Sequence, residues 1–204
     1  MKAISLRSAF LSAILAIAVS GACRADEVRA KIQYCTECHG ASGRGYHGYF
    51  PIPRLAGQTS QYIQNQLRAF VEGRRETDIG MDMAKVHGIS PAMRTAVAAH
   101  FRDLEPAPIR DAPRESIEAG RKIYEDGIPK ANVPACAACH GPEAKGGGEI
   151  PRLAGQLYPF TVKELANWSK ERTGSDASTI MRTVAGNMTK SQIEAVAAYV
   201  NHLN

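Results

Sequence analysis

The chain has few spare cysteines, no apolar run long enough to span a bilayer and no strongly basic segment. Its main apolar run, Ala9–Val19, is shorter than the ~20 residues that a membrane-spanning helix needs. The formal net charge is +5, but nothing in the sequence forms the basic face or stripe that nucleic-acid binding requires. No segment of any length alternates apolar and polar residues as a strand does. These absences favour an all-α protein without a nucleic-acid partner.

The first 25 residues predict a cleavable export signal. Lys2 and Arg7 form a positively charged start, the run Ala9–Val19 follows, and small residues lead to Ala25, which we expect to be the last residue removed. Cleavage would lower the net charge from +5 to about +2, because Lys2, Arg7 and one further arginine leave with the signal. We therefore expect an exported protein with a mature chain close to neutral.

Four of the five cysteines fall in two C-x-x-C-H motifs, Cys35–His39 and Cys136–His140. The fifth, Cys23, lies in the signal, where a lipoprotein site is a minor alternative because the residues before it lack a large apolar side chain. No cysteine of the mature chain remains for a disulfide. C-x-x-C-H is the attachment motif of c-type haem, in which two thioethers hold the porphyrin and the histidine ligates the iron. The sequence thus predicts two covalently bound haem c groups.

Two other uses of these motifs are possible in principle. A zinc knuckle needs further paired cysteine or histidine ligands nearby, and the mature chain has no spare cysteine. A thioredoxin-like dithiol needs a βαβ context, and the sequence shows no strand pattern. Both alternatives are therefore weaker than haem attachment.

The sequence is an internal duplication. Pro-Arg-Leu-Ala-Gly-Gln occurs at Pro53–Gln58 and again at Pro151–Gln156, and the two copies then align without a gap, through Arg74 and Arg172, as far as Asp78 and Asp176, at a constant offset of 98 residues. A segment with three prolines separates the copies and predicts an extended linker. We expect a first domain over residues 26–105, a linker over 106–113 and a second domain over 114–204.

Helix signals are clear at the ends of both copies. A helix is expected over Ser116–Glu125, where Gly120 indicates a close crossing with another helix, since glycine costs ~1 kcal/mol inside a helix. Thr189, with Gln192 three residues later, predicts the start of the last helix through a capping box. In the first copy Ser90 is the expected cap, with proline at the first helical position.

The sixth iron ligand of each haem is expected to be a methionine in a loop before the last helix of its domain. Met181 is the candidate in the second domain, and we expect Met188 to pack into the core instead. In the first domain Met83 lies 98 residues before Met181, the offset of the repeat, so we choose it over Met81. His87 is a weaker rival.

Two further pairs of repeated residues have expected roles. The carbonyls of Pro53 and Pro151 are candidates to accept a hydrogen bond from the ligating histidines, because such histidines normally donate their other ring N–H. Arg54 and Arg152 would either pair with haem propionates or be solvated.

These motifs resemble the dihaem cytochrome c4 family over essentially the whole mature chain. The resemblance rests on both C-x-x-C-H sites, both Pro-Arg-Leu-Ala-Gly-Gln segments, and a methionine followed by a Ser- or Thr-capped helix in each copy. It implies two tandem class I cytochrome c domains related by approximate two-fold symmetry, with the haems near their interface. It assigns haem attachment to Cys35, Cys38, Cys136 and Cys139, and iron ligation to His39, Met83, His140 and Met181. Ala30 and His100 depart from the family pattern, which expects glycine and tyrosine there.

The function implied is periplasmic transfer of single electrons in a respiratory chain, and not catalysis. Two His/Met-ligated irons have both coordination positions filled and offer none to peroxide or oxygen. The expected partners are redox proteins, namely an electron donor and a terminal oxidase or dehydrogenase, with membrane association only through them. One alternative is the dihaem subunit of a larger oxidoreductase, such as a flavocytochrome sulfide dehydrogenase. A dihaem peroxidase is a weaker alternative.

Overall fold

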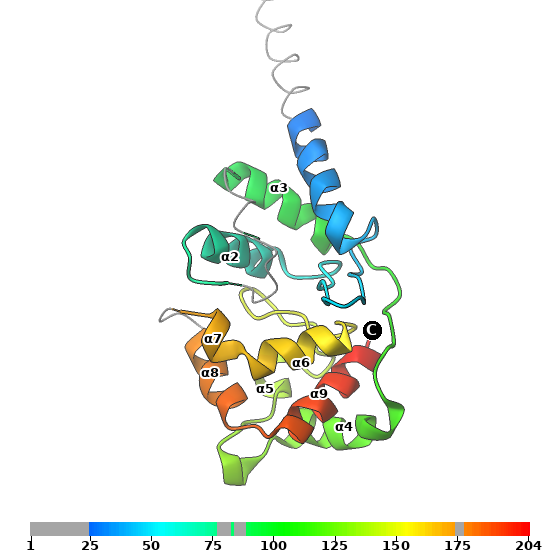
Figure 1. Cartoon of the computed structure of the whole chain (residues 1–204), viewed down its shortest axis with the longest axis vertical. Helices are drawn as coiled ribbons and strands as arrows, with labels where there is room; N and C mark the ends of the chain where they lie inside the picture. Colours follow the sequence, from blue (N-terminus) through cyan, green and yellow to red (C-terminus); the bar gives the residue numbers. More distant parts are fainter. Residues whose placement is uncertain (1–24, 77–82, 84–88, 174–177) are drawn as a thin grey trace, which may run out of the picture.

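In the computed structural model, which describes residues 25–76, 83, 89–173 and 178–204, the chain forms two helical domains (Figure 1). Within these ranges the regular structure is α-helix and short 3-10 helix, and β-pairing is confined to isolated bridges. No described helix is long and apolar enough to cross a membrane. The prediction of an all-α fold is confirmed. The predicted signal lies almost entirely outside the described residues.

Three helices of the first domain lie within its described residues. One covers residues 25–39, and the others are α2 (Ser60–Val71) and α3 (Pro91–Arg102). The Ser90 hydroxyl accepts a hydrogen bond from a backbone N–H in the first turn of α3, as the cap pattern predicts. Helices α2 and α3 pack on one another around a core that includes the fully buried Phe101.

The second domain has more helical elements, which occur in the order η2 (Arg114–Ser116), α4 (Ile117–Asp126), η3 (Pro129–Ala131), α5 (Ala137–His140), α6 (Tyr158–Ala166), α7 (Trp168–Glu171), α8 (Ser178–Gly186) and α9 (Lys190–His202). The helix expected over Ser116–Glu125 is α4, one residue later than expected and preceded by the single turn η2. Thr189 and Gln192 form the complete capping box at the start of α9, so that prediction is confirmed.

Helices α4 and α9 cross at Gly120, as the sequence predicts. A Cβ at this position would lie 2.0 Å from the Ala195 carbonyl oxygen and 2.9 Å from Tyr199 Cβ. Only hydrogen fits between the two helices, so glycine fixes how closely the first and last helices of the domain approach.

The two domains are joined by reciprocal hydrogen bonds across a pseudo-two-fold axis. The Gln58 side chain accepts from Arg152 N (2.7 Å) and donates to Arg152 O (3.1 Å). Gln156 does the same to Arg54, with distances of 2.8 and 3.0 Å. Both glutamines are buried, so each side-chain amide supplies the hydrogen-bond partners that water would otherwise give to backbone groups of the other domain. Residues 104–113 run between the domains without helix (Figure 1).

Candidate functional site

The two C-x-x-C-H histidines have the same surroundings in both domains. His39 and His140 are each 6% exposed. His39 Nδ1 lies 2.9 Å from the Pro53 carbonyl oxygen, and His140 Nδ1 lies 3.0 Å from that of Pro151. Burial lowers the pKa of both imidazoles below the usual value, which keeps them neutral. A neutral imidazole whose Nδ1–H is held by a carbonyl presents Nε2 to a metal.

The local backbone explains why the sequence places these carbonyls there. In the second domain the amides of Leu153 and Ala154 both donate to the Ala144 carbonyl (2.7 and 3.0 Å), which folds the Pro151 segment back toward the motif. In the first domain Leu55 and Ala56 donate in the same way to Gly43 (2.8 and 2.9 Å). The repeated hexapeptide therefore carries out the expected role of orienting each histidine.

The cysteines of each motif form no disulfide and differ in exposure. Cys35 and Cys136 are partly buried, whereas Cys38 and Cys139 are exposed. Burial raises the pKa of Cys35, and it raises that of Cys136 to about 11. Reactive cysteines depend on a lowered pKa, so Cys35 and Cys136 do not have the electrostatics of reactive thiolates.

No three Cys, His, Asp or Glu side chains converge as ligands of a metal ion among the described residues. Two cysteines without a disulfide, next to a buried, oriented imidazole, instead fit a covalently attached haem in both domains.

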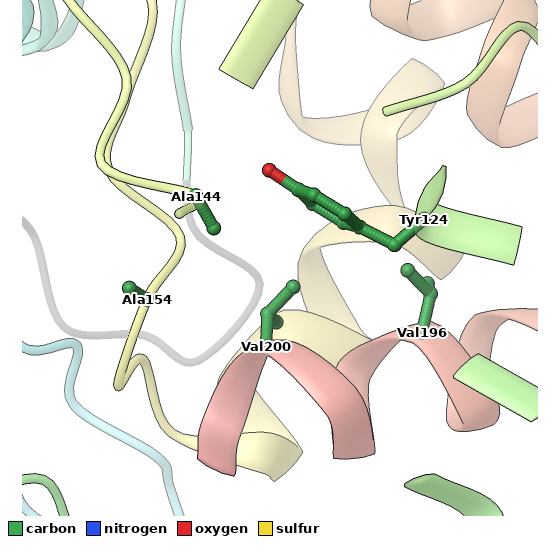
Figure 2. Close-up of a cluster of buried hydrophobic side chains, with 5 residues drawn as sticks. All are labelled: Tyr124, Ala144, Ala154, Val196 and Val200. Carbon is green, nitrogen blue, oxygen red and sulfur yellow. The ribbon is translucent and has the colours of Figure 1, made fainter. Parts of the chain in front are cut away.

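The second motif is held against a compact apolar core. Tyr124 is fully buried beside Val196 and Val200 of α9, with Ala144 and Ala154 on the facing loop (Figure 2). Cys136 packs on the edge of this core. The Tyr124 hydroxyl donates to the Gly141 carbonyl at 2.6 Å, immediately after the motif histidine.

The first motif is more open than the second. Tyr34, which directly precedes Cys35, is 52% exposed, and Ala30 is also exposed. The residues after the first motif form a small hairpin that the second domain has only in a shorter form, with Tyr46 paired to Ile52 by hydrogen bonds of 3.0 Å. Its tip carries the exposed Tyr49, so the two domains differ in the loop that follows the motif.

The methionine candidates differ in their positions. Met181 is partly buried and lies within helix α8, so the expectation of a loop position is wrong for the second domain. Met188 packs against the core of that domain, as predicted. Met83 is partly buried, and Met81 and His87 lie outside the described residues.

Arg54 and Arg152 are not solvated, since they are 4% and 8% exposed. Their Nε atoms donate to the carbonyls of Ala56 (2.9 Å) and Ala154 (3.1 Å) in matching geometry. Arg54 Nη1 donates to the linker carbonyl of Pro106 at 2.9 Å, which ties the linker to the interface. Burial and the neighbouring Arg152 lower the pKa of Arg54 to about 10.

The gapless pairing of Arg74 with Arg172 is also wrong. The counterpart of Arg172 is Arg75: each guanidinium stacks on the aromatic ring of its own domain, 4.8 Å from the Phe70 centroid and 3.9 Å from that of Trp168. Arg75 and Arg172 also form an antiparallel bridge with one another. The first domain has one extra residue between its ring and its arginine, so the offset there is 97.

A buried ionic cluster at this bridge was missed by the sequence analysis. Glu164 Oε2 accepts from Arg75 Nη2 at 3.0 Å and also from Arg172 Nη2. Nothing in the sequence marks Glu164 among the 20 acidic residues as buried. The sequence could have indicated the interface glutamines. Gln58 and Gln156 are repeated in the hexapeptide, although only its proline carbonyl is needed to orient the histidine, so their repetition indicates a further role.

The chain is similar to known cytochromes c. The family model for cytochrome c matches residues 29–111 and again 117–204. Cytochrome c-552 of Acidithiobacillus ferridurans is 33% identical over 202 residues, covering 94% of this chain and 85% of the relative. The thiosulfate dehydrogenase electron acceptor of Thiomonas intermedia is 37% identical over 172 residues, covering 81% and 76%.

Among solved structures, cytochrome c4 of Acidithiobacillus ferrooxidans superposes with a TM-score of 0.72 at 33% identity, covering 83% of this chain and 98% of that one. Two cytochrome c domains imply two covalently bound haem c groups, and the two cysteine pairs fit the attachment motif. The chain therefore belongs to the cytochrome c family, as a dihaem electron-transfer protein of the cytochrome c4 type.

Proposed function

We propose that this protein carries single electrons in the periplasm, from a dehydrogenase to a further redox protein, and catalyses no reaction of its own. The observation that carries the proposal is the matched histidine–carbonyl pair, His39 with Pro53 and His140 with Pro151, at 2.9 and 3.0 Å. Two haem sites with equally oriented histidines in one chain suit electron transfer from one haem to the other.

In this proposal Cys35, Cys38, Cys136 and Cys139 hold the haems, and His39, Met83, His140 and Met181 are the axial ligands. Haem iron supplies the chemistry when bound, by cycling between ferrous and ferric states. The protein holds each imidazole ring fixed through its Nδ1 hydrogen bond, so that the ligands would rearrange little when the charge of the iron changes. Methionine as the second ligand favours the reduced state and raises the reduction potential.

The proposed donor is an enzyme of inorganic sulfur oxidation. One relative is named a thiosulfate dehydrogenase electron acceptor, and its 37% identity covers most of both chains. If the protein is instead a permanent subunit of a larger oxidoreductase, the electron transfer is the same. That alternative changes only how long the carrier and the enzyme stay bound to one another. Copurification of the native complex separates a subunit from a free carrier.

The ligand assignment is tested by absorption spectra of the purified holoprotein with a haem count. We expect two low-spin haems showing the methionine–iron charge-transfer band. Met181→Ala should lose about half of that band and open the second iron to added ligands. Met188→Ala is the matched control, since Met188 packs against the core and should leave the band intact.

The same comparison decides the first haem. Met83→Ala should remove the other half of the band, whereas Met81→Ala should not; the reverse result would transfer the ligand role to Met81. A high-spin haem that reacts with peroxide in the wild-type protein would overturn the carrier function and favour a peroxidase.

A further inference from the structure

The arginines of the repeated hexapeptide, Arg54 and Arg152, lie next to one another across the pseudo-two-fold axis. Each guanidinium reaches over the hexapeptide of the other domain. A Cβ built on Gly57 would lie 3.3 Å from Arg152 Nη1, and one built on Gly155 would lie 3.6 Å from Arg54 Nη1. The duplication therefore brings two positive charges together at the domain interface.

The two arginines line a cavity of about 310 Å³ between the domains. The rest of its wall comes from residues 105–108 of the linker, from Gly155 and from residues 203–204, which follow α9 and lie beside the linker (Figure 1). The Nε and Nη1 atoms of both arginines are bonded as described above, but within the described residues their Nη2 atoms have no hydrogen-bond partner. Both side chains are more than nine-tenths buried, so only a molecule that enters the cavity can accept hydrogen bonds from these two atoms.

The charge of this arginine pair is poorly compensated. Arg152 Nη1 lies 3.4 Å from Glu105 Oε1, but the Glu105 side chain is 73% exposed, so water screens its charge. Among the described residues Arg54 has no acidic partner within salt-bridge distance. Burial and the charge of Arg152 lower the pKa of Arg54 to about 10, which is the direction expected when two cations are held together away from water. An anion in the cavity would relieve this repulsion.

The other arginine pair of the interface shows how the protein compensates such charges elsewhere. Arg75 and Arg172 also come from different domains and are also buried, and the buried carboxylate of Glu164 lies between them and contacts both. A buried cation is costly unless an anion pairs with it. The cavity beside the hexapeptide arginines thus has the two cations of such a cluster without its buried anion.

We propose that the cavity between Arg54 and Arg152 binds one small divalent oxyanion, of the class of sulfate, thiosulfate and phosphate. Guanidinium groups match the oxygens of such anions with forked, charge-assisted hydrogen bonds. The anion is a free one and not a carboxylate of the haem, because the cavity wall contains no residue of either C-x-x-C-H motif and neither Met83 nor Met181. This inference does not rest on the carrier function, since neither haem motif lines the site.

The test is isothermal titration calorimetry of the holoprotein with sodium sulfate, at an ionic strength held constant with sodium chloride. We expect saturable binding of one sulfate per chain, with phosphate competing for the same site. Arg152→Gln should weaken sulfate binding about tenfold, because it removes one of the two charged donors. Arg121→Gln is the matched control, since Arg121 is an exposed arginine of the second domain that pairs with two surface glutamates, and it should leave the affinity unchanged.

A second variant tests the site by a gain of affinity. Glu105→Gln removes the exposed carboxylate that pairs with Arg152, so sulfate should bind about threefold more tightly. This variant remains informative if Arg152→Gln folds poorly, because Glu105 is on the surface. No saturable binding to the wild type, or an equal loss of affinity in Arg152→Gln and Arg121→Gln, would refute the inference. If the wild type binds no sulfate and Arg152→Gln shifts a haem potential, the pair holds a haem carboxylate and the inference is wrong. The carrier function is tested separately by the spectra of the two haems.

Discussion

Replacing Gly120 with alanine should destabilise the second domain, even though alanine is the better helix former. The added Cβ would lie 2.0 Å from Ala195 O and 2.6 Å from Ala195 C, which is backbone that cannot rotate away. Restoring an ordinary contact of 3.4 Å requires α4 and α9 to separate by about 1.4 Å. A gap of even 0.5–1 Å already forfeits a quarter to a half of the dispersion energy of each contact.

The net magnitude follows from two opposing effects. Overpacking typically costs 1–3 kcal/mol, and the crossing at Gly120 falls at the upper end because both helices must move. The higher helix propensity of alanine offsets ~1 kcal/mol of this loss. The expected loss is about 2 kcal/mol, which corresponds to a decrease of about 1 M in the urea midpoint for a slope of ~2 kcal/mol/M.

The assay is urea unfolding of the holoprotein followed by circular dichroism. Ala30→Gly is the matched control, since it changes the exposed residue at the corresponding helix of the first domain and should cost only the ~1 kcal/mol of helix propensity. A Gly120→Ala protein with a midpoint equal to or above the wild type would show that the crossing is not limited by this contact, and the packing argument would then fail.

Three further predictions concern the interface and the second haem site. Gln58→Ala and Gln156→Ala should each cost about 2 kcal/mol in urea unfolding, because each leaves backbone groups of the other domain buried without partners; markedly unequal costs would contradict the symmetric interface. Glu164 has a pKa of about 2, below the ~4.3 of an unfolded glutamate, so it stabilises the fold above that range, and about 3 kcal/mol should be lost as the pH falls from 5 to about 1; acid titration of Glu164→Gln should lack this component. Tyr124→Phe should lose about 1 kcal/mol by removing its hydrogen bond to Gly141, whereas Tyr34→Phe, at an exposed position, should change the urea midpoint little.

The features that the sequence predicts correctly are those with a local cause. A capping box needs only Thr189 and Gln192, which are three residues apart, and it forms wherever the helix starts. Gly120 is similar, because a glycine inside an amphipathic helix has few explanations other than a close crossing. The role of the Pro53 and Pro151 carbonyls follows from the chemistry of a ligating histidine, which needs an acceptor nearby.

The features that the sequence does not predict depend on contacts between the domains. Gly73 adopts a positive φ of 66° and accommodates one extra residue after α2, so a constant offset assigns the wrong arginine to the interface. The bridge between Arg75 and Arg172 and the matching ring contacts of their guanidinium groups reveal the shift. Sequence also cannot distinguish the buried Glu164 from solvated carboxylates, because its burial depends on cations supplied from both domains.

Duplication explains why the histidines of the two sites are oriented alike. Electron transfer in one direction, however, requires that the two haems differ in reduction potential. Features that maintain each site are repeated closely: the histidine–carbonyl distances differ by 0.1 Å, and the interface glutamines bond reciprocally. The differences lie instead where a change does not disturb ligation, in the exposure of Tyr34 against the buried Tyr124 and in the single carboxylate of Glu164. Solvent access and buried charge are both properties that set a haem potential. The asymmetry of this protein is therefore concentrated in side chains outside the proposed ligand set.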